Sequence, residues 1–136
     1  MRIFLDPNIL FSAARADGAV RQLLALIEAA RHEQWAETYV VEEARRNLTA
    51  KSPGGLAALD AMTARITIVG FNAGAALSPD LFSLPEKDRP VLGSAIHYQC
   101  NILVTGDRTH FGPLFGKTVQ GVSILSPAML ANTLCL

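Results

Sequence analysis

Short apolar runs that alternate with amphipathic segments are the feature that most limits how this chain can fold. The first run, Ile3–Leu5, is apolar at every position, which is typical of a strand buried on both faces. Similar runs predict further strands at Trp35–Val40, Ile66–Val69, Asn101–Thr105 and Val122–Leu125. Strands separated by helices in this way favour a three-layer α/β/α sandwich around a mostly parallel sheet.

Apolar residues at helical spacing predict a helix in each interval between these strands. The predicted helices are Asn8–Ala14, Ala19–His32, a third through Val41, Ala44 and Leu48 that ends near Lys51, Leu56–Arg65, Asp88–Gln99, a short turn around His110 and Phe111, and Pro127–Leu134. Residues 72–85 are rich in Ala, Gly, Ser and Pro and predict a loop. With no repeat and no second unit, residues 1–136 are expected to form a single domain.

The charge balance of the chain excludes a global electrostatic field that would recruit nucleic acid. Lys plus Arg and Asp plus Glu each number 12, so any polyanion must bind a local patch or a metal ion. Cys100 and Cys135 lack metal-ligand spacing and are expected to be buried thiols. No apolar run approaches the roughly 20 residues that span a bilayer, and no signal-peptide pattern is present, so we expect a soluble, cytoplasmic protein.

Two acids directly follow predicted strands. Asp6 comes after Ile3–Leu5, and Asp107 comes after Asn101–Thr105. In a parallel sheet both carboxylates lie at the carboxyl edge, where ligands bind. Turn chemistry is the competing explanation, because Asp-Pro and Gly-Asp pairs commonly stand in turns and at helix caps.

Two further acids accompany predicted helices. Glu43 lies on the shoulder of the apolar stripe of its helix, whereas Glu42 points nearly the opposite way, into solvent. Asp88 precedes Val91 and Leu92 at the start of the next long helix, where capping alone would favour an acid. The ordinary alternatives are a solvated surface residue for Glu43 and a helix cap for Asp88.

Four carboxylates around one cavity would repel one another unless a cation lay between them. A site of carboxylate oxygens suits Mg²⁺ or Mn²⁺, which activate water and stabilise the leaving oxygen of a phosphodiester. No phosphate-binding loop, dinucleotide fingerprint or nucleophile elbow offers a competing site. His110 is interpreted as a turn residue, with a phosphate contact as the alternative. The basic side chains that could form a rim for a polyanion are Arg45, Arg46, Arg89 and Arg108.

The motifs assembled in this order resemble the PIN-domain family of metal-dependent nucleases, and in particular its small bacterial members similar to VapC-type toxins. The resemblance runs through nearly the whole chain. It rests on Leu5-Asp6-Pro7-Asn8-Ile9-Leu10-Phe11-Ser12-Ala13, Val41-Glu42-Glu43-Ala44-Arg45-Arg46-Asn47-Leu48, Leu84-Pro85-Glu86-Lys87-Asp88-Arg89-Pro90-Val91-Leu92, Ile102-Leu103-Val104-Thr105-Gly106-Asp107-Arg108-Thr109-His110-Phe111 and Ile124-Leu125-Ser126-Pro127-Ala128-Met129-Leu130.

The resemblance implies a parallel five-stranded sheet and a metal-dependent endoribonuclease that is the toxin of a toxin–antitoxin pair. The family's acid quartet maps onto Asp6, Glu43, Asp88 and Asp107, with Asn8 and Thr105 as accessory polar residues. Asp6, Asp88 and Asp107 would hold Mg²⁺ or Mn²⁺, and Glu43 would hold it directly or through water. RNA as substrate, a small antitoxin as inhibitor and a homodimer are implied in the same way.

Three alternatives stay open from the sequence. A stand-alone nuclease without an antitoxin is one. A non-catalytic binding module of the same fold is another, because Pro7 stands where the family usually has Thr or Ser and the net charge is zero. A phosphatase-like hydrolase with Asp6 as nucleophile is the third, although that chemistry normally needs a second acid where this chain has Asn8.

Overall fold

A mostly parallel sheet with helices on both faces forms the body of the protein in the computed structural model, which describes residues 1–70 and 89–135. The described strands are β1 (Arg2–Leu5), β2 (Glu33–Glu37), β3 (Thr67–Val69), β4 (Ile102–Val104), β5 (Thr118–Val119) and β6 (Val122–Leu125). They form a six-stranded sheet in the order β3-β2-β1-β4-β6-β5. The three-layer α/β/α architecture predicted from the sequence is confirmed.

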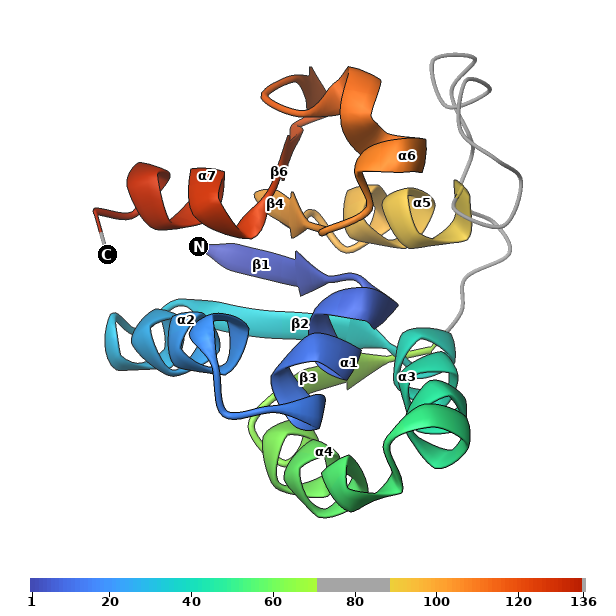
Figure 1. Cartoon of the computed structure of the whole chain (residues 1–136). Coiled ribbons are helices and arrows are strands. Elements are labelled where there is room, and N and C mark those ends of the chain that lie inside the picture. The colour runs from blue at the N-terminus through green and yellow to red at the C-terminus, as the bar shows by residue number, and fades with distance from the viewer. Residues whose placement is uncertain (71–88, 136) are drawn as a thin grey trace.

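The helices follow the strands in the alternation that the sequence predicts. They are α1 (Pro7–Arg15), α2 (Ala19–Ala29), α3 (Thr38–Lys51), α4 (Leu56–Thr63), α5 (Arg89–His97), α6 (Arg108–Phe111) and α7 (Pro127–Thr133), with 3₁₀ turns at Pro53–Gly55 and Gly112–Leu114. Figure 1 shows α1 to α4 grouped around β1, β2 and β3, and α5, α6 and α7 around β4 and β6.

The core lies between the central strands and the helices that cover them. All residues of β1 after Arg2 and all residues of β4 are buried. This burial on both faces explains why the two strands are continuous apolar runs in the sequence. Phe4, Leu10, Leu103 and Phe111 are among the largest side chains with no exposed surface. Burial of these side chains holds β1, β4 and the segments that follow them in place. Those segments contain Asp6 and Asp107, two of the acids predicted to form the site.

The second strand departs from its predicted bounds. The sequence predicts a strand over Trp35–Val40, but β2 ends at Glu37 and the next residues form the first turn of α3. Val40 is buried at helical spacing before Ala44 and Leu48. The β-branched side chains of the predicted strand therefore belong to the helix, because packing overrides local propensity.

Among the helices that end earlier than predicted, α2 and α5 do so for the same reason. Arg31 and Gln99 have positive φ angles of 64° and 56°, and each stops its helix. The next N–H, that of His32 or Cys100, donates to a carbonyl five residues back. This pattern satisfies the last carbonyls of α2 and α5, which end at Ala29 and His97 instead of His32 and Gln99.

The edge of the sheet carries a strand that the sequence analysis missed. The five strands β3, β2, β1, β4 and β6 are parallel, as the resemblance implies, but β5 adds a short antiparallel sixth strand. Gln120 and Gly121 join β5 to β6 with φ angles of 48° and 88°, which suits a two-residue hairpin turn. The two-residue strand is too short to give a periodic signal in the sequence.

The two cysteines differ from each other. Cys100 is buried, as expected, and burial raises the pKa of its thiol to about 11. Cys135 is exposed, so the expectation that it is buried is wrong. It lies just after α7 (Pro127–Thr133).

Candidate active site

Two neighbouring strands deliver polar residues to the carboxyl edge of the sheet. β1 and β4 are parallel with Leu5 opposite Val104, and the Asp6 N–H continues their ladder to the Val104 carbonyl over 3.2 Å. This register places Asp6 beside Thr105. In Figure 1 the arrowheads of β1 and β2 end beside α1 and α3, so helices begin where these strands stop.

The Asp6 carboxylate is buried and held by a neighbouring hydroxyl. Asp6 is 5% exposed, and the hydroxyl of the fully buried Thr105 donates to its Oδ2 atom over 2.6 Å. Asp6 occupies the N-cap position of α1 but makes no side-chain cap hydrogen bond there. The capping explanation considered from the sequence therefore does not account for the orientation of this carboxylate.

Asp107 is joined to the same hydroxyl through its backbone. The Asp107 N–H donates to Thr105 Oγ1 over 3.1 Å, so Thr105 accepts from one acidic residue while it donates to the other. Asp107 caps α6, and its Oδ1 atom accepts from the His110 N–H over 3.1 Å. Its Oδ2 atom lies 2.8 Å from His110 Nδ1. Here the capping prediction is right, and it coexists with a place at the sheet edge.

Glu43 reaches the same region from the side. It is half-buried on α3, whose buried stripe is Val40, Ala44 and Leu48. Helical periodicity predicts that Glu43 lies on the shoulder of that stripe. In the structure its side chain lines a cleft of about 120 Å³. Residues from the first, third and fifth helices and the segment after β4 line the cleft: Asp6, Pro7, Asn8, Tyr39, Glu43, Asn47, Val91 and Asp107.

The structure thus brings three of the four predicted acids, Asp6, Glu43 and Asp107, to one cleft. Asp88 lies outside the described residues. The predicted accessory residues are close by: Asn8 lines the cleft and accepts from the Gly106 N–H over 3.4 Å, and the fully buried Thr105 contacts the cleft residue Asp6.

None of the four arginines predicted to form a basic rim is among the described residues that line the cleft. Arg45 and Arg46 are exposed on α3 and line a separate open pocket with Glu42. Arg45 also forms an ion pair with Asp60 at 2.7 Å. Arg108 is exposed at the start of α6, and Arg89 is the first residue of α5.

Three residues of this region were not among the site residues predicted from the sequence, although helical periodicity places Asn47 on the same shoulder of the stripe as Glu43. Tyr39 and Asn47 line the cleft from α3, one turn before and one turn after Glu43. The spacing of four residues on either side of Glu43 is the signal that could have identified them. Glu37 is the third: it is 1% exposed, ends β2 and accepts from the Tyr39 N–H at the N-cap of α3.

The environment of Glu37 disfavours its charged form. Burial is the main cause that raises the pKa of this carboxyl, the Tyr39 N–H opposes the rise, and the charge of Glu42 adds to it. Among the described residues, Glu37 Oε2 is buried without a hydrogen-bond partner. Because the folded protein holds this proton more tightly than the unfolded chain, stability falls as the pH rises through the unfolded and then the folded pKa.

We therefore predict that Glu37→Gln stabilises the protein at pH 8 and gives little change at pH 4. The neutral amide has a similar shape and avoids the cost of a buried charge. Thermal melts in EDTA across this pH range measure the effect, with the exposed Glu42→Gln as a control that should give a smaller gain of the same sign. A Glu37→Gln protein that is less stable than wild type at pH 8 contradicts the prediction.

The chemistry of the cleft suits a hard divalent cation. Its charged donors are carboxylate oxygens, and Asn8 and Asn47 add amide groups, a set that fits Mg²⁺ or Mn²⁺ and not a thiol-seeking metal. In the described residues no three acidic, His or Cys side chains converge tightly enough to enclose an ion. Mg²⁺ keeps several water ligands when it binds proteins, so an open set of carboxylates is compatible with it.

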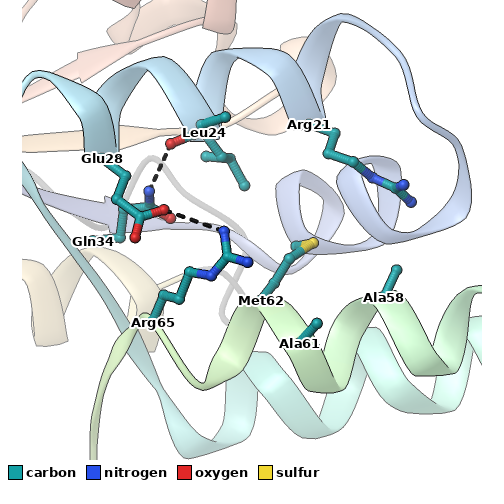
Figure 2. Close-up of a pocket in the computed structure, with 9 residues that line it drawn as sticks. Arg21, Leu24, Glu28, Gln34, Ala58, Ala61, Met62 and Arg65 are labelled. Carbon is teal, nitrogen blue, oxygen red and sulfur yellow. Dashed lines mark hydrogen bonds and ion pairs between the residues drawn. The ribbon is translucent and has the colours of Figure 1, made fainter.

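A second pocket, of about 240 Å³, lies between α2 and α4 (Figure 2). Its charged side chains already have partners: Arg21 donates to the Ala13 and Ala14 carbonyls, and Arg65 pairs with Glu28 at 3.4 Å. Leu24, Ala25, Ala58, Ala61 and Met62 supply an apolar lining. This pocket is larger than the cleft, but Glu28 is the one acid among its described lining residues, so it lacks the group of carboxylates found in the cleft.

No described helix is both long enough and apolar enough to cross a membrane. Comparison with known proteins identifies a family and a similar fold among solved structures. The PIN domain family model matches residues 2–109, a range that includes all four predicted acids. No curated protein matches the chain.

Among solved structures, the fold resembles a chain in the crystal structure of VapBC2 from Rickettsia felis bound to a DNA fragment from their promoter. The match has a TM-score of 0.71 at 18% identity and covers 93% of this chain and 98% of that one. At this identity the likeness concerns the fold. The family model covers most of the chain and agrees with the sheet, so this chain belongs to the PIN domain family.

Proposed function

We propose that the protein is a Mg²⁺- or Mn²⁺-dependent endoribonuclease whose active site is the cleft lined by Asp6, Glu43 and Asp107. The single observation that carries the proposal is the convergence of these acids, from three separate segments of the chain, on one cleft at the carboxyl edge of the sheet. The PIN family membership and the oxygen-only donor set support it. Asp88, which directly precedes α5, is proposed as the fourth acid.

Each residue has a distinct part in the proposed mechanism. Asp6 and Asp107, with Asp88, would hold the cation, and Glu43 would contact it directly or through water. When bound, the cation supplies a Lewis acid that activates water and stabilises the charge that develops on the phosphodiester oxygens. Thr105 orients the Asp6 carboxylate from below, and Asn8 and Asn47 present amides to the substrate at the cleft wall.

Local electrostatics favour this arrangement. Asp6 and Asp107 stand at the N-termini of α1 and α6, where the partial positive charge of a helix stabilises an anion. RNA carries its own negative charge, which the acids alone would repel. The exposed Arg108, which directly follows Asp107 at the start of α6, is proposed to supply positive charge toward the phosphate backbone.

Cleavage of a labelled single-stranded RNA with Mn²⁺, Mg²⁺ or EDTA tests the proposal. We expect cutting with at least one of the cations, none in EDTA, and recovery when excess Mn²⁺ is added back. A matched single-stranded DNA should be cut more slowly. Folded protein that cuts no RNA under any condition would favour the non-catalytic binding module instead.

We also propose a small antitoxin as protein partner. The similar fold in VapBC2 is described as part of a complex bound to promoter DNA, which supports a partner encoded beside this chain. Addition of the product of a short neighbouring gene should suppress RNA cleavage and form a stable complex. A neighbourhood without such a gene would favour a stand-alone nuclease. A homodimer is proposed on the same resemblance and is measured by light scattering.

A further inference from the structure

We propose that Phe11, Arg15 and Lys51 form a second RNA contact, which binds nucleotides of the substrate outside the cleft. We call this surface the Phe11 patch. The inference rests on the proposed function, because it extends the path of the same RNA beyond the candidate active site. It assigns these residues a role in substrate binding and none in the reaction itself.

The Phe11 patch lies one helical turn beyond the wall of the cleft. Pro7 lines the cleft from α1, and Phe11 follows it four residues later on the same face of the helix. Asn47 lines the cleft from α3, and Lys51 follows it four residues later. These two helices pack against each other, and Figure 1 shows both leading away from the ends of β1 and β2. The cleft and the patch therefore lie along the same pair of helices.

Two cations from different helices meet at the Phe11 ring. The guanidinium carbon of Arg15 and the ammonium nitrogen of Lys51 each lie 6.0 Å from the centroid of this ring. Phe11 is half-buried and packs against the core, whereas Arg15 and Lys51 are exposed. The distance is at the outer limit of a cation–π interaction, so both long side chains can turn toward a phosphate without the loss of a tight contact.

The helix dipole is the ordinary explanation for these cations. Arg15 and Lys51 lie in the last turns of α1 and α3, where the partial negative charge of a helix end attracts a cation. That explanation does not require both charges to lie beside one aromatic ring. Nor does either charge have an acidic partner among the described residues, whereas Arg45 on the same helix as Lys51 pairs with Asp60.

An aromatic ring between two unpaired cations is a pattern that suits single-stranded nucleic acid. Bases stack on aromatic side chains, while Lys and Arg contact the phosphates between them. The cleft itself lacks these groups, because every charged residue of its described lining is an acid. Positive charge for the RNA must therefore come from residues beside the cleft, and the Phe11 patch supplies two such charges.

Two substitutions of Phe11 separate base stacking from packing. Phe11→Leu keeps an apolar side chain but removes the ring, whereas Phe11→Tyr keeps the ring. Because the patch needs no metal, wild-type protein should bind a labelled single-stranded RNA in EDTA, where the proposed cleavage does not occur. We expect Phe11→Leu to weaken this binding about 5- to 100-fold and Phe11→Tyr to bind like wild type.

An abasic nucleotide placed at successive positions of the RNA identifies the stacked base. At one position it should weaken binding to wild-type protein about as much as Phe11→Leu does. Combined with Phe11→Leu, the same abasic RNA should show no further loss, because both changes remove one contact. This non-additivity distinguishes a stacked base from a general effect of the substitution on the fold.

The salt dependence of RNA binding tests the two cations. Lys51→Gln and Arg15→Gln should each reduce the slope of log affinity against log salt concentration by about 0.7, the value for one phosphate contact with a single strand. Lys117→Gln is the matched control, because Lys117 is exposed directly before β5, at the edge of the sheet opposite β3. It should keep the wild-type slope.

Phe11→Leu protein that binds RNA like wild type, or equal salt slopes for Lys51→Gln and Lys117→Gln, would overturn the inference. Wild-type protein that cuts RNA with Mn²⁺ but does not bind it in EDTA would also overturn it. Variants that keep RNA binding but lose the proposed antitoxin would show that the patch binds protein instead. Wild-type protein that binds RNA through the patch but never cuts it would overturn the proposed function, so the two failures are distinguishable.

Discussion

Asp6→Asn is expected to lower metal-dependent RNA cleavage by at least about 100-fold while the protein stays folded. Asp6 is the most buried of the acids in the cleft, and its amide analogue keeps the shape and an oxygen for Thr105. It loses the charge that attracts the cation. Loss of a supporting residue at a metal site already costs about 10- to 100-fold, so loss of a ligand should cost more.

The same variant should melt at or above the wild-type temperature in EDTA. Without a cation the acids of the cleft repel one another, and removal of one charge relieves that repulsion. Initial cleavage rates and thermal melts on the same preparations measure both effects, with the exposed Asp17→Asn as the control acid. Undiminished cleavage by a pure Asp6→Asn protein would place the active site elsewhere.

Thr105→Val should impair stability and metal binding together. Valine preserves the shape of the fully buried side chain but removes the hydroxyl that donates to Asp6 and accepts from the Asp107 N–H. A hydrogen bond to a charged group contributes about 1.5–3 kcal/mol, and here a buried carboxylate loses it. We therefore expect the free energy of unfolding to fall by about 2 kcal/mol in EDTA and Mn²⁺ affinity to fall about tenfold.

Thr105→Ser is the matched variant for this prediction, because it keeps the hydroxyl and loses only the methyl group. Urea unfolding in EDTA and Mn²⁺ binding should both return most of the way to wild type. If the Val and Ser variants were equally defective, packing of the methyl group would explain the loss, and the role assigned to the hydroxyl would be wrong.

The sequence predicted most of the fold because its strongest signals are local. The continuous apolar runs of β1 and β4 and the helical spacing of Val40, Ala44 and Leu48 each reflect burial that a chain of this class must achieve. Asp6 and Asp107 could be placed at one edge of the sheet because parallel strands end together. Glu43 could be oriented from the helical period alone.

Other features depend on contacts between distant segments and left no local signal. The hydrogen bond between Thr105 and Asp6 joins residues 99 positions apart and arises from the register of β1 with β4. The burial of Glu37 could not be predicted from the sequence. Glu37 lies within the strand predicted over Trp35–Val40, and its burial depends on where β2 ends. The helix cap that Asp107 forms with the His110 N–H, by contrast, spans three residues and was predicted from the sequence as turn and capping chemistry.

A Mn²⁺ titration of the wild-type protein tests the central claim most directly when the bound ion and the initial rate of RNA cleavage are recorded on the same samples. If the acids of the cleft act by holding the cation, the cleavage rate should rise with the bound ion and level off at the same Mn²⁺ concentration. Cleavage that is already complete without Mn²⁺, or that does not follow the bound ion, would contradict the claim.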